Sequence, residues 1–324
     1  MCTAVAYKSN SLYFGRTLDN DFSYNEEVTI SPRNYNFTFR NRAEIRKHYA
    51  IIGMAYVCDN YPLYYDAMNE KGLCMAGLNF VGNAKYNKNI HGKENIAQFE
   101  LIPWILSQCP DTDSAIKLLK KTNITNDNFN SNLSSAELHW MISDNNKSIT
   151  VESVIDGLKI YDNHIGVLTN NPPFEIQLFS LNNYINLSPK ESENRFSDKI
   201  NLNRYSRGMG AIGLPGDLSS QSRFIRAAFT NANSVKGKSE IENISQFFHI
   251  MNSVEQPIGS CILENGKYEK TIYTSCCCAK EGIYCYTTYD NRQITAVNLN
   301  KENLDNENPI KYPLINEEQI KNQN

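Results

Sequence analysis

Two features that would point to a macromolecular or membrane partner are missing from this sequence. Of its 324 residues, 32 are Lys or Arg and 35 are Asp or Glu, which leaves a formal net charge of −3. Proteins that bind nucleic acid usually carry a basic footprint, so we expect no nucleic-acid partner. No apolar run is long enough to span a bilayer, so we expect no membrane association. The composition is that of an ordinary globular protein.

Metal-ligand spacings are absent as well. The nine cysteines form no CxxC pair, and the five histidines show no ligand spacing. Cys276, Cys277 and Cys278 are adjacent in a strand-like segment, where successive side chains point to opposite faces, so their thiols cannot converge on one ion. We therefore expect no metal site. The chain also shows no export signal, which favours a reducing cytoplasm and free thiols.

Common hydrolase signatures are missing too, since the sequence contains neither GxSxG nor HExxH. His139 and His249 stand among apolar residues, so we predict that both are packed, hydrogen-bonded groups of the core. A Cys–His dyad between distant segments stays open from the sequence.

The order of the predicted elements indicates packed sheets with helices outside them. Strand-like runs such as CTAVAY and LYFGRTLD are followed by two predicted helices, AQFELIPWILSQC and DTDSAIKLLKKT. A second group of strands, two more helices including the Ser-capped SSQSRFIRAAFTNA, and final strands complete the pattern. We predict one domain over residues 2–324, with a polar tail at about 313–324. The pattern fits several α+β arrangements and does not choose between them.

Cys2 is a candidate nucleophile that needs no histidine. Once Met1 is removed, its thiol stands beside a free α-amine, whose pKa of about 8 leaves a useful fraction unprotonated near neutral pH. That amine can accept the thiol proton directly or through one water. Such a site also needs a carboxylate, a cation and oxyanion donors. Arg16 and Asp19, in FGRTLDN on the next predicted strand, supply the first two. Taken alone, Cys2 is better explained as an unremarkable residue of a chain terminus, and Arg16 and Asp19 as a strand-end arginine and a turn aspartate on the surface.

Matching segments along the chain favour the catalytic interpretation of these residues, because the sequence resembles the choloylglycine hydrolase family nearly from end to end. This family contains conjugated bile salt hydrolases and penicillin V acylases and belongs to the N-terminal nucleophile superfamily. The matching segments are, in chain order, MCTA, FGRTLDN, MNEKGL, AGLNF, LHWMISD, GVLTNNPPF, GLPGDLSSQSRFIRAAF and YTSCCCAKEGIYCYTTYD. Several of them are long and lie far apart, so the resemblance is specific.

The resemblance implies six catalytic positions: Cys2, Arg16, Asp19, Asn79, Asn170 and Arg223. Cys2 is then the nucleophile exposed by loss of Met1, Arg16 is the cation near the thiol, and Asp19 is the carboxylate that holds the α-amine.

The other three positions concern the oxyanion and a second cation. Asn79 and Asn170 match the oxyanion-hole positions. Arg223 matches the second active-site arginine and is preferred to the neighbouring Arg226 because of its place after the PGD segment.

The same resemblance implies the fold and the assembly. We expect a four-layer αββα sandwich of two packed antiparallel sheets, which is an α+β fold. We further expect a homo-oligomer, with a tetramer favoured, and no cofactor.

The implied activity is hydrolysis of the amide bond between a bile acid and glycine or taurine, through a thioester on the N-terminal cysteine. An acylase acting on penicillin V or N-acyl homoserine lactones is the alternative, and an inactive binding protein of the same fold is a second one. The acylase branch often has tyrosine where this sequence has Asn79, which favours bile salts.

Two further segments suggest substrate contacts. The aromatic segment YVCDNYPLYYDAMN suggests Tyr61, Leu63 and Tyr65 as pocket-lining residues, although a buried strand explains them equally well. Arg207 lies in a segment that resembles the family's selectivity loop, where a guanidinium would pair bidentately with the carboxylate of a glycine conjugate. A solvated loop arginine remains the alternative.

Overall fold

A β-hairpin at the N-terminus begins the fold and carries the predicted nucleophile. In the computed structural model, which describes residues 1–324, β1 (Cys2–Lys8) and β2 (Leu12–Asn20) pair antiparallel, with Cys2 opposite Leu18. The FGRTLDN segment therefore lies beside Cys2 in space.

The hairpin belongs to a six-stranded sheet of order β12-β1-β2-β13-β14-β15, in which every neighbouring pair is antiparallel. The added strands are β12 (Val167–Leu168), β13 (Lys270–Cys278), β14 (Ile283–Thr288) and β15 (Asn291–Asn298). The N-terminal strands thus pair with strands from the last part of the chain.

A second, eight-stranded sheet has the order β11-β10-β9-β6-β5-β4-β3-β16 and is also antiparallel throughout. Its strands are β3 (Glu27–Ser31), β4 (Ile51–Cys58), β5 (Tyr61–Asn69), β6 (Cys74–Asn79), β9 (Leu138–Ser143), β10 (Ser148–Val154), β11 (Gly157–Asp162) and β16 (Ile310–Pro313). Strands β1 and β2 contact β6 across the space between the two sheets.

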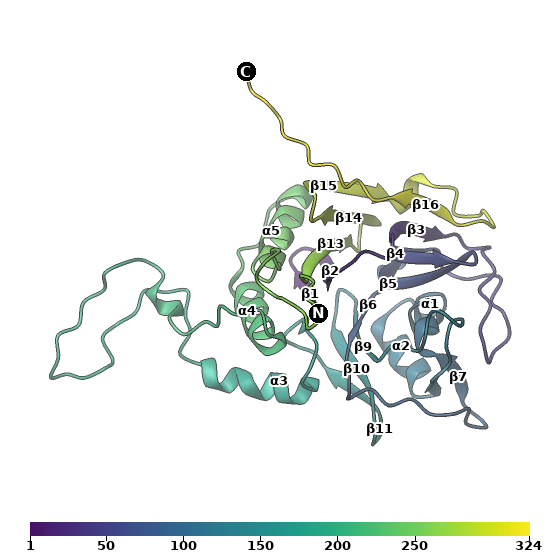
Figure 1. Cartoon of the computed structure of the whole chain (residues 1–324), viewed down its shortest axis with the longest axis horizontal. Helices are drawn as coiled ribbons and strands as arrows, with labels where there is room; N and C mark the ends of the chain where they lie inside the picture. The colour runs from purple at the N-terminus through teal and green to yellow at the C-terminus, as the bar shows by residue number, and fades with distance from the viewer.

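Helices cover the outer face of each sheet (Figure 1). On the six-stranded sheet they are α4 (Ser220–Asn233) and α5 (Glu240–Asn252), and on the eight-stranded sheet α1 (Leu101–Leu106) contacts β5 and β6, with α2 (Thr112–Leu119) beside it. The layer order is therefore helix, sheet, sheet, helix, and the expected αββα sandwich is confirmed.

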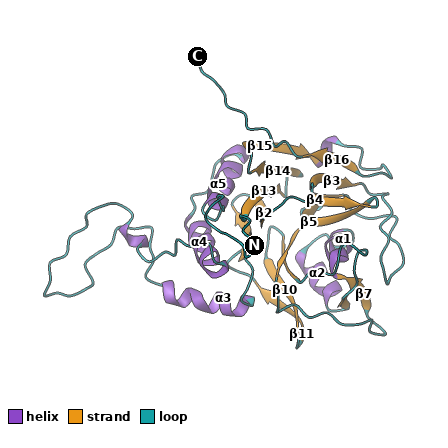
Figure 2. Ribbon diagram, viewed as in Figure 1, coloured by secondary structure: helices purple, strands orange, loops and turns teal.

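The remaining elements are short (Figure 2). They are the parallel pair β7 (Glu94–Ala97) and β8 (Thr122–Thr125), helix α3 (Phe174–Ser180), and the 3₁₀ turns η1 (Gln98–Glu100), η2 (Leu181–Tyr184), η3 (Met209–Ala211) and η4 (Leu299–Lys301). None of the helices combines the length and apolarity that crossing a bilayer requires.

Strand periodicity divides the core into two apolar clusters. On β6, the side chains of Cys74, Ala76 and Leu78 join the cluster between the sheets, whereas Met75 joins the cluster under α1 and α2. Successive side chains of a strand point to opposite faces, so a strand buried on both faces reads as a nearly continuous apolar run.

The two histidines predicted for the core differ in burial. His139 on β9 is fully buried, as predicted. The prediction for His249 was wrong, because this residue is exposed on α5 between the buried Phe248 and Ile250. Each helical residue turns by about 100°, so apolar neighbours in the sequence do not place a helical side chain in the core.

Between η2 and α4 the chain leaves the body as a long arm, defined here as residues 185–215 (Figure 1). It contains only one short turn, η3, and exposes several large apolar side chains. These are Ile185, Phe196, Ile200, Leu202, Tyr205 and Ile212.

Candidate active site

Cys2 lies next to a cavity that both sheets border. The residue is 2% exposed, and the cavity has a volume of about 280 Å³. Arg16 of β2 and Asn79 of β6 line the same cavity, so residues of the two sheets meet beside the thiol.

Arg16 holds its guanidinium against the Cys2 sulfur. Its Nη2 donates to Cys2 Sγ, and its Nη1 donates to the backbone carbonyls of Gly77 and, at 3.4 Å, of Tyr65. Burial lowers the pKa of Arg16, but the negative charges of Cys2 and nearby acidic groups outweigh this effect, and the pKa is raised overall. The guanidinium therefore stays charged beside the Cys2 sulfur.

Asp19 is enclosed by hydrogen-bond donors. Its carboxylate accepts from Thr17 Oγ1 at 3.1 Å, Thr271 Oγ1 at 2.7 Å and Gln256 Nε2 at 3.2 Å, and Arg223 Nη1 lies 3.9 Å away. Burial raises the pKa of Asp19, and the charge of Arg223 opposes that rise. Sequence reasoning missed Gln256 and Thr271, which lie far along the chain and carry no local signal.

Met1 is attached in the structure, so the nitrogen of Cys2 is a peptide nitrogen. It donates to Asn170 Oδ1 at 2.8 Å. The amine of Met1 donates to the backbone carbonyl of Asp19 at 2.7 Å and forms an ion pair with the buried Glu269, another residue that the sequence did not reveal. The predicted contact between the Asp19 carboxylate and the Cys2 amine concerns the processed chain and stays a prediction.

Arg223 reaches Cys2 from the first turns of α4. Its Nη1 donates to Cys2 O and to Thr3 Oγ1, both at 2.6 Å, and its Nη2 donates to Asn170 Oδ1 at 2.8 Å. Burial lowers the pKa of Arg223, and the Asp19 carboxylate opposes this effect. The neighbouring Arg226 instead donates to backbone carbonyls away from Cys2, so of the two arginines it is Arg223 that contacts the backbone of Cys2.

The two asparagines lie side by side. Asn170 Nδ2 donates to Asn79 O at 2.9 Å. Phe80 N donates to Glu137 O, so the adjacent Asn79–Leu138 pair is a non-hydrogen-bonded pair of the β6–β9 ladder. Because the N–H and C=O of a strand residue point to the same side, the Asn79 N–H also points away from β9, toward the side of Asn170.

The predicted substrate contacts are only partly at the cavity. Leu63 and Tyr65 line it, but Tyr61 does not. The ring of Tyr61, at the start of β5, packs behind Phe99 and Phe129, with centroid distances of 6.3 and 5.8 Å, and these two rings line the cavity in its place. The other apolar lining residues missed by the sequence reasoning are Leu18, Tyr24, Tyr56, Tyr64, Leu133, Ala136 and Leu138.

Arg207 is exposed on the arm and does not line the Cys2 cavity of its own chain. The same part of the arm contains a GxGxxG spacing at Gly208, Gly210 and Gly213. No strand precedes it, so it lacks the strand–turn–helix context in which such a spacing binds a dinucleotide.

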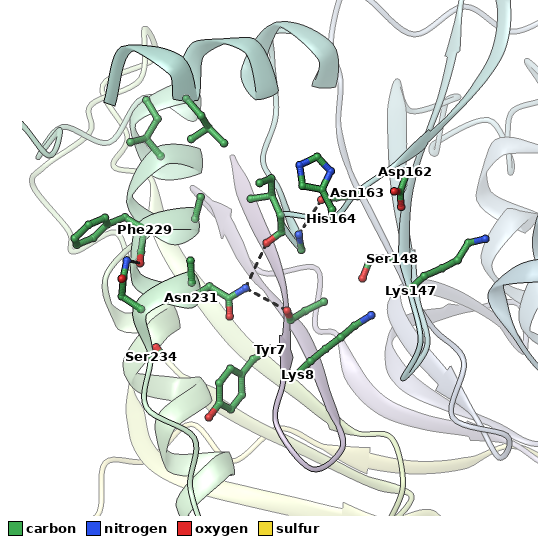
Figure 3. A pocket seen from close by; sticks show the side chains of 18 of the residues that line it. Tyr7, Lys8, Lys147, Ser148, Asp162, Asn163, His164, Phe229, Asn231 and Ser234 are labelled. Carbon is green, nitrogen blue, oxygen red and sulfur yellow. Dashed lines mark hydrogen bonds between the residues drawn. The ribbon is translucent and has the colours of Figure 1, made fainter. Parts of the chain in front are cut away.

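A larger cavity, of about 770 Å³, lies at the opposite end of β1 (Figure 3). It is bordered by Lys8 and by Asn231, whose Nδ2 donates to the backbone carbonyls of Ala6 and Ile165 at 3.2 and 3.5 Å. No cysteine lines it, and Ala6, the first residue of β1 that borders it, lies roughly 13 Å along the strand from Cys2. The smaller cavity is therefore the candidate active site on chemical grounds.

The αββα sandwich with a buried thiol at the start of its first strand has the architecture of the N-terminal nucleophile hydrolases. A family model described as "Linear amide C-N hydrolases, choloylglycine hydrolase family" matches residues 2–312. The chain belongs to the choloylglycine hydrolase family.

Relatives of known function resemble the chain over nearly its whole length. A bile salt hydrolase/transferase of Lactiplantibacillus plantarum is 55% identical over 98% of both chains. A bile salt hydrolase/transferase of Clostridium perfringens is 40% identical over 94% of both.

Solved structures agree with this relationship. A Cys2→Ala variant of the conjugated bile acid hydrolase from Clostridium perfringens superimposes with a TM-score of 0.93, at 38% identity over the whole of both chains. Penicillin V acylase from Agrobacterium tumefaciens, at 20% identity and a TM-score of 0.76 over 96% of this chain and 91% of its own, shares the fold.

Proposed function

We propose that this protein hydrolyses the amide bond between a bile acid and glycine or taurine. The observation that carries the proposal is the Cys2 sulfur held against the Arg16 guanidinium at an apolar cavity. The relatives at 55% and 40% identity, both bile salt hydrolases/transferases, support the choice of substrate.

The first half of the reaction forms a thioester. After removal of Met1, the α-amine of Cys2 takes the thiol proton, and the thiolate attacks the amide carbon, so that a C–S bond forms and the carbonyl electron pair moves to oxygen. The N–H of Asn79 and the second hydrogen of Asn170 Nδ2 donate to that oxyanion. Removing one such donor typically costs about 3–4 kcal/mol of transition-state stabilisation.

Collapse of this tetrahedral intermediate completes the thioester, and hydrolysis of the thioester then releases the acid. The C–N bond breaks as the α-ammonium group of Cys2 protonates the leaving amine, which departs as glycine or taurine. Water then attacks the thioester and gives its proton to the same α-amine, and the C–S bond breaks. The thiolate and a free bile acid result, so one group handles every proton.

The cavity wall suits a steroid better than a polar acyl group. Tyr24, Tyr56, Leu63, Phe99 and Phe129 supply apolar and aromatic surface beside Cys2. Such surface favours a rigid hydrocarbon skeleton, although apolar contact alone separates related ligands by only about 1–3 kcal/mol per methylene.

Parallel assays test the proposal against its alternatives. The purified protein is incubated with glycocholate, taurocholate, penicillin V and an N-acyl homoserine lactone, and release of each amine is measured. Hydrolysis of the bile salts well above the other two is the expected result. Preference for penicillin V or the lactone would make the protein an acylase, and inertness toward all four in a chain shown by mass spectrometry to lack Met1 would favour the binding protein.

We also propose that the protein is a homo-oligomer, a tetramer being favoured, whose copies associate through the arm. Large exposed apolar patches on soluble proteins commonly mark interfaces. The arm carries Phe196 and Tyr205 at 78% and 84% exposure. A role of Arg207 in selecting glycine conjugates requires the arm of one copy to reach the cavity of another. Unchanged preference for glycocholate over taurocholate in an Arg207→Ala variant would remove that role.

We further propose that the protein is located in the cytoplasm. All nine cysteines are free thiols, including the directly opposed Cys276 and Cys285 of β13 and β14. Thiols of this kind persist in a reducing compartment. Fractionation of the producing cells tests this, and recovery of the protein outside them would contradict it.

A further inference from the structure

A fully buried histidine–glutamate pair lies behind the two asparagines. His139 on β9 and Glu152 on β10 are both 0% exposed, and His139 Nδ1 lies 3.0 Å from Glu152 Oε1. His139 belongs to the LHWMISD segment, which the reaction described above leaves without a role.

The hydrogen bonds of the pair determine where its protons lie. His139 Nε2 is 2.7 Å from Thr169 O, and a carbonyl oxygen only accepts, so Nε2 carries a hydrogen. Phe174 N donates to Glu152 Oε1 at 3.0 Å. Glu152 Oε1 lies beside the other ring nitrogen, Nδ1, and the contacts at the two nitrogens together fix the orientation of the ring.

One imidazole therefore contacts the neighbours of both asparagines. Thr169, which accepts from Nε2, directly precedes Asn170. Phe80, which directly follows Asn79, stacks on the His139 ring with a centroid distance of 4.3 Å and an interplanar angle of 7°.

These contacts join two different sheets. Asn170 follows β12 of the six-stranded sheet, whereas His139 and Asn79 lie on adjacent strands of the eight-stranded sheet. The Asn170 segment is also held by Gln177, whose Nε2 donates to Asn170 O at 2.5 Å, and by Ser220, whose Oγ accepts from Asn170 N at 2.8 Å. The His139 contact adds a tie between the Asn170 segment and the sheet that carries Asn79.

We propose that His139, oriented by Glu152, is a positioning residue that sets the two asparagines relative to each other and to Cys2. The inference rests on the proposed function, because it assigns these asparagines to the oxyanion. A displacement of about 1 Å at such a site can cost 100-fold in rate. Loss of the Nε2–H donor should therefore lower kcat without removing the nucleophile.

Two double variants that differ in the side chain at position 139 test this. In both, Glu152→Gln keeps an oxygen to accept from Phe174 N and leaves no lone buried charge. His139→Phe then keeps the ring stack on Phe80 but removes the donor to Thr169 O, whereas His139→Gln keeps a side-chain N–H of similar reach. We expect kcat to fall about 10- to 100-fold in the phenylalanine variant and by less than about 5-fold in the glutamine variant, with KM little changed in both.

Alkylation of Cys2 by iodoacetamide supplies the second readout. This reaction needs the thiolate but forms no oxyanion, so its rate should stay within about 2-fold of wild type in both variants. His249→Phe, at the exposed histidine of α5, is the matched control and should change neither rate. If the phenylalanine double variant does not fold, His139→Leu with Glu152→Gln, which also removes the donor to Thr169 O but fills less volume, takes its place, and the same fall in kcat with unchanged alkylation is expected.

The outcomes separate the inference from the proposed function. A wild-type protein that is alkylated but hydrolyses no bile salt defeats the proposed function. A wild-type enzyme that is active, with equal kcat in the two double variants, or with alkylation and hydrolysis falling together, defeats the positioning role of His139.

Discussion

At the scale of single residues, the orientation of Asn170 is the feature on which the site depends. Its Oδ1 accepts from Cys2 N and from Arg223 Nη2, both at 2.8 Å, so its Nδ2 is directed to Asn79 O. A carboxamide has one accepting and one donating end, and two donors on one end determine the direction of the other. The amide hydrogens are thereby aimed before any substrate arrives.

The nucleophile can be tested by substitution at Cys2. Cys2→Ala should abolish bile salt hydrolysis while leaving the circular dichroism spectrum and melting temperature close to those of wild type, because one small buried side chain is replaced. Cys2→Ser should hydrolyse far more slowly than wild type, since a hydroxyl is a much weaker nucleophile than a thiolate beside the same amine.

The matched control is Cys58→Ser, at a partly exposed cysteine away from the cavity. It should keep full activity. Appreciable hydrolysis by the alanine variant would remove Cys2 from the reaction.

At the scale of elements, close packing of β2 against β13 holds the arginine at the thiol. Gly15 directly precedes Arg16, and a Cβ on it would collide with Ser275 O of β13. The Arg16 N–H donates to Ser275 Oγ at 3.1 Å in the same place. The glycine of FGRTLDN is therefore required by the approach of two backbones.

Gly15→Ala should consequently push β2 away from β13. We expect a loss of about 1–3 kcal/mol in the free energy of unfolding, as for other overpacked sites, and reduced hydrolysis because Arg16 shifts with the strand. Urea denaturation and kcat measure the two effects. Gly216→Ala, where a Cβ meets no atom within 4 Å, is the control, and equal stability of the two variants would contradict the argument.

The turn η1 gives a prediction about pH. Glu100 is buried and accepts from the backbone N–H groups of Arg40 and Ala97 at 2.7 and 2.9 Å, and burial raises its pKa to about 7. The pKa of Glu100 is therefore higher in the folded protein than its value of about 4.3 in the unfolded chain. Its contribution to stability is complete below a pH of about 4.3 and is lost as the pH rises through about 7. The free energy of unfolding should therefore fall by a few kcal/mol between pH 4.5 and pH 8, at about 1.4 kcal/mol per pKa unit.

Glu100→Gln removes the titrating group and should flatten this part of the stability curve. Denaturation of both proteins at pH 5, 6, 7 and 8 measures the difference. Glu318→Gln, in the exposed tail, should behave as wild type. A variant as pH-dependent as wild type would show that Glu100 does not titrate in this range.

At the scale of the whole molecule, the site exists because two sheets meet. Cys2, Arg16 and Asn170 come from the six-stranded sheet or its end, whereas Asn79 and the cavity residue Tyr65 come from the eight-stranded sheet. The part of the larger apolar cluster that lies between the sheets, which includes Cys74, Ala76 and Leu78 of β6, fixes their separation. Packing density in such a core makes that separation hard to change.

The arm gives the prediction for the assembled protein. The double substitution Phe196→Ser and Tyr205→Ser should convert the proposed oligomer to single chains, because it removes the largest exposed apolar groups of the arm. Light scattering after size-exclusion chromatography measures the mass. Ile155→Ser, at a residue 84% exposed in the β10–β11 turn, should not change it, and a wild-type protein that already runs as one chain would refute the interface.

Several parts of the fold and site could be read from the sequence. The hairpin that brings Arg16 beside Cys2 follows from two short strands and one turn. The alternating and continuous apolar runs predicted the sheets, and the serine before α4 predicted its N-cap, since Ser219 accepts from Ser222 N at 3.4 Å. His249 shows where such predictions fail, because apolar neighbours in the chain do not decide which side of a helix faces the core.

By itself, then, the sequence determined the local arrangements: strand order along the chain, the hairpin, the helix cap and the family to which the motifs belong. Only the tertiary structure decided that Glu269 lies at the N-terminus, that Gln256 and Thr271 enclose Asp19, and that the arm carries Arg207 away from its own cavity. Each of these contacts depends on the packing of segments far apart in the chain. That packing is the sum of many small contacts, and no local sequence pattern indicates it.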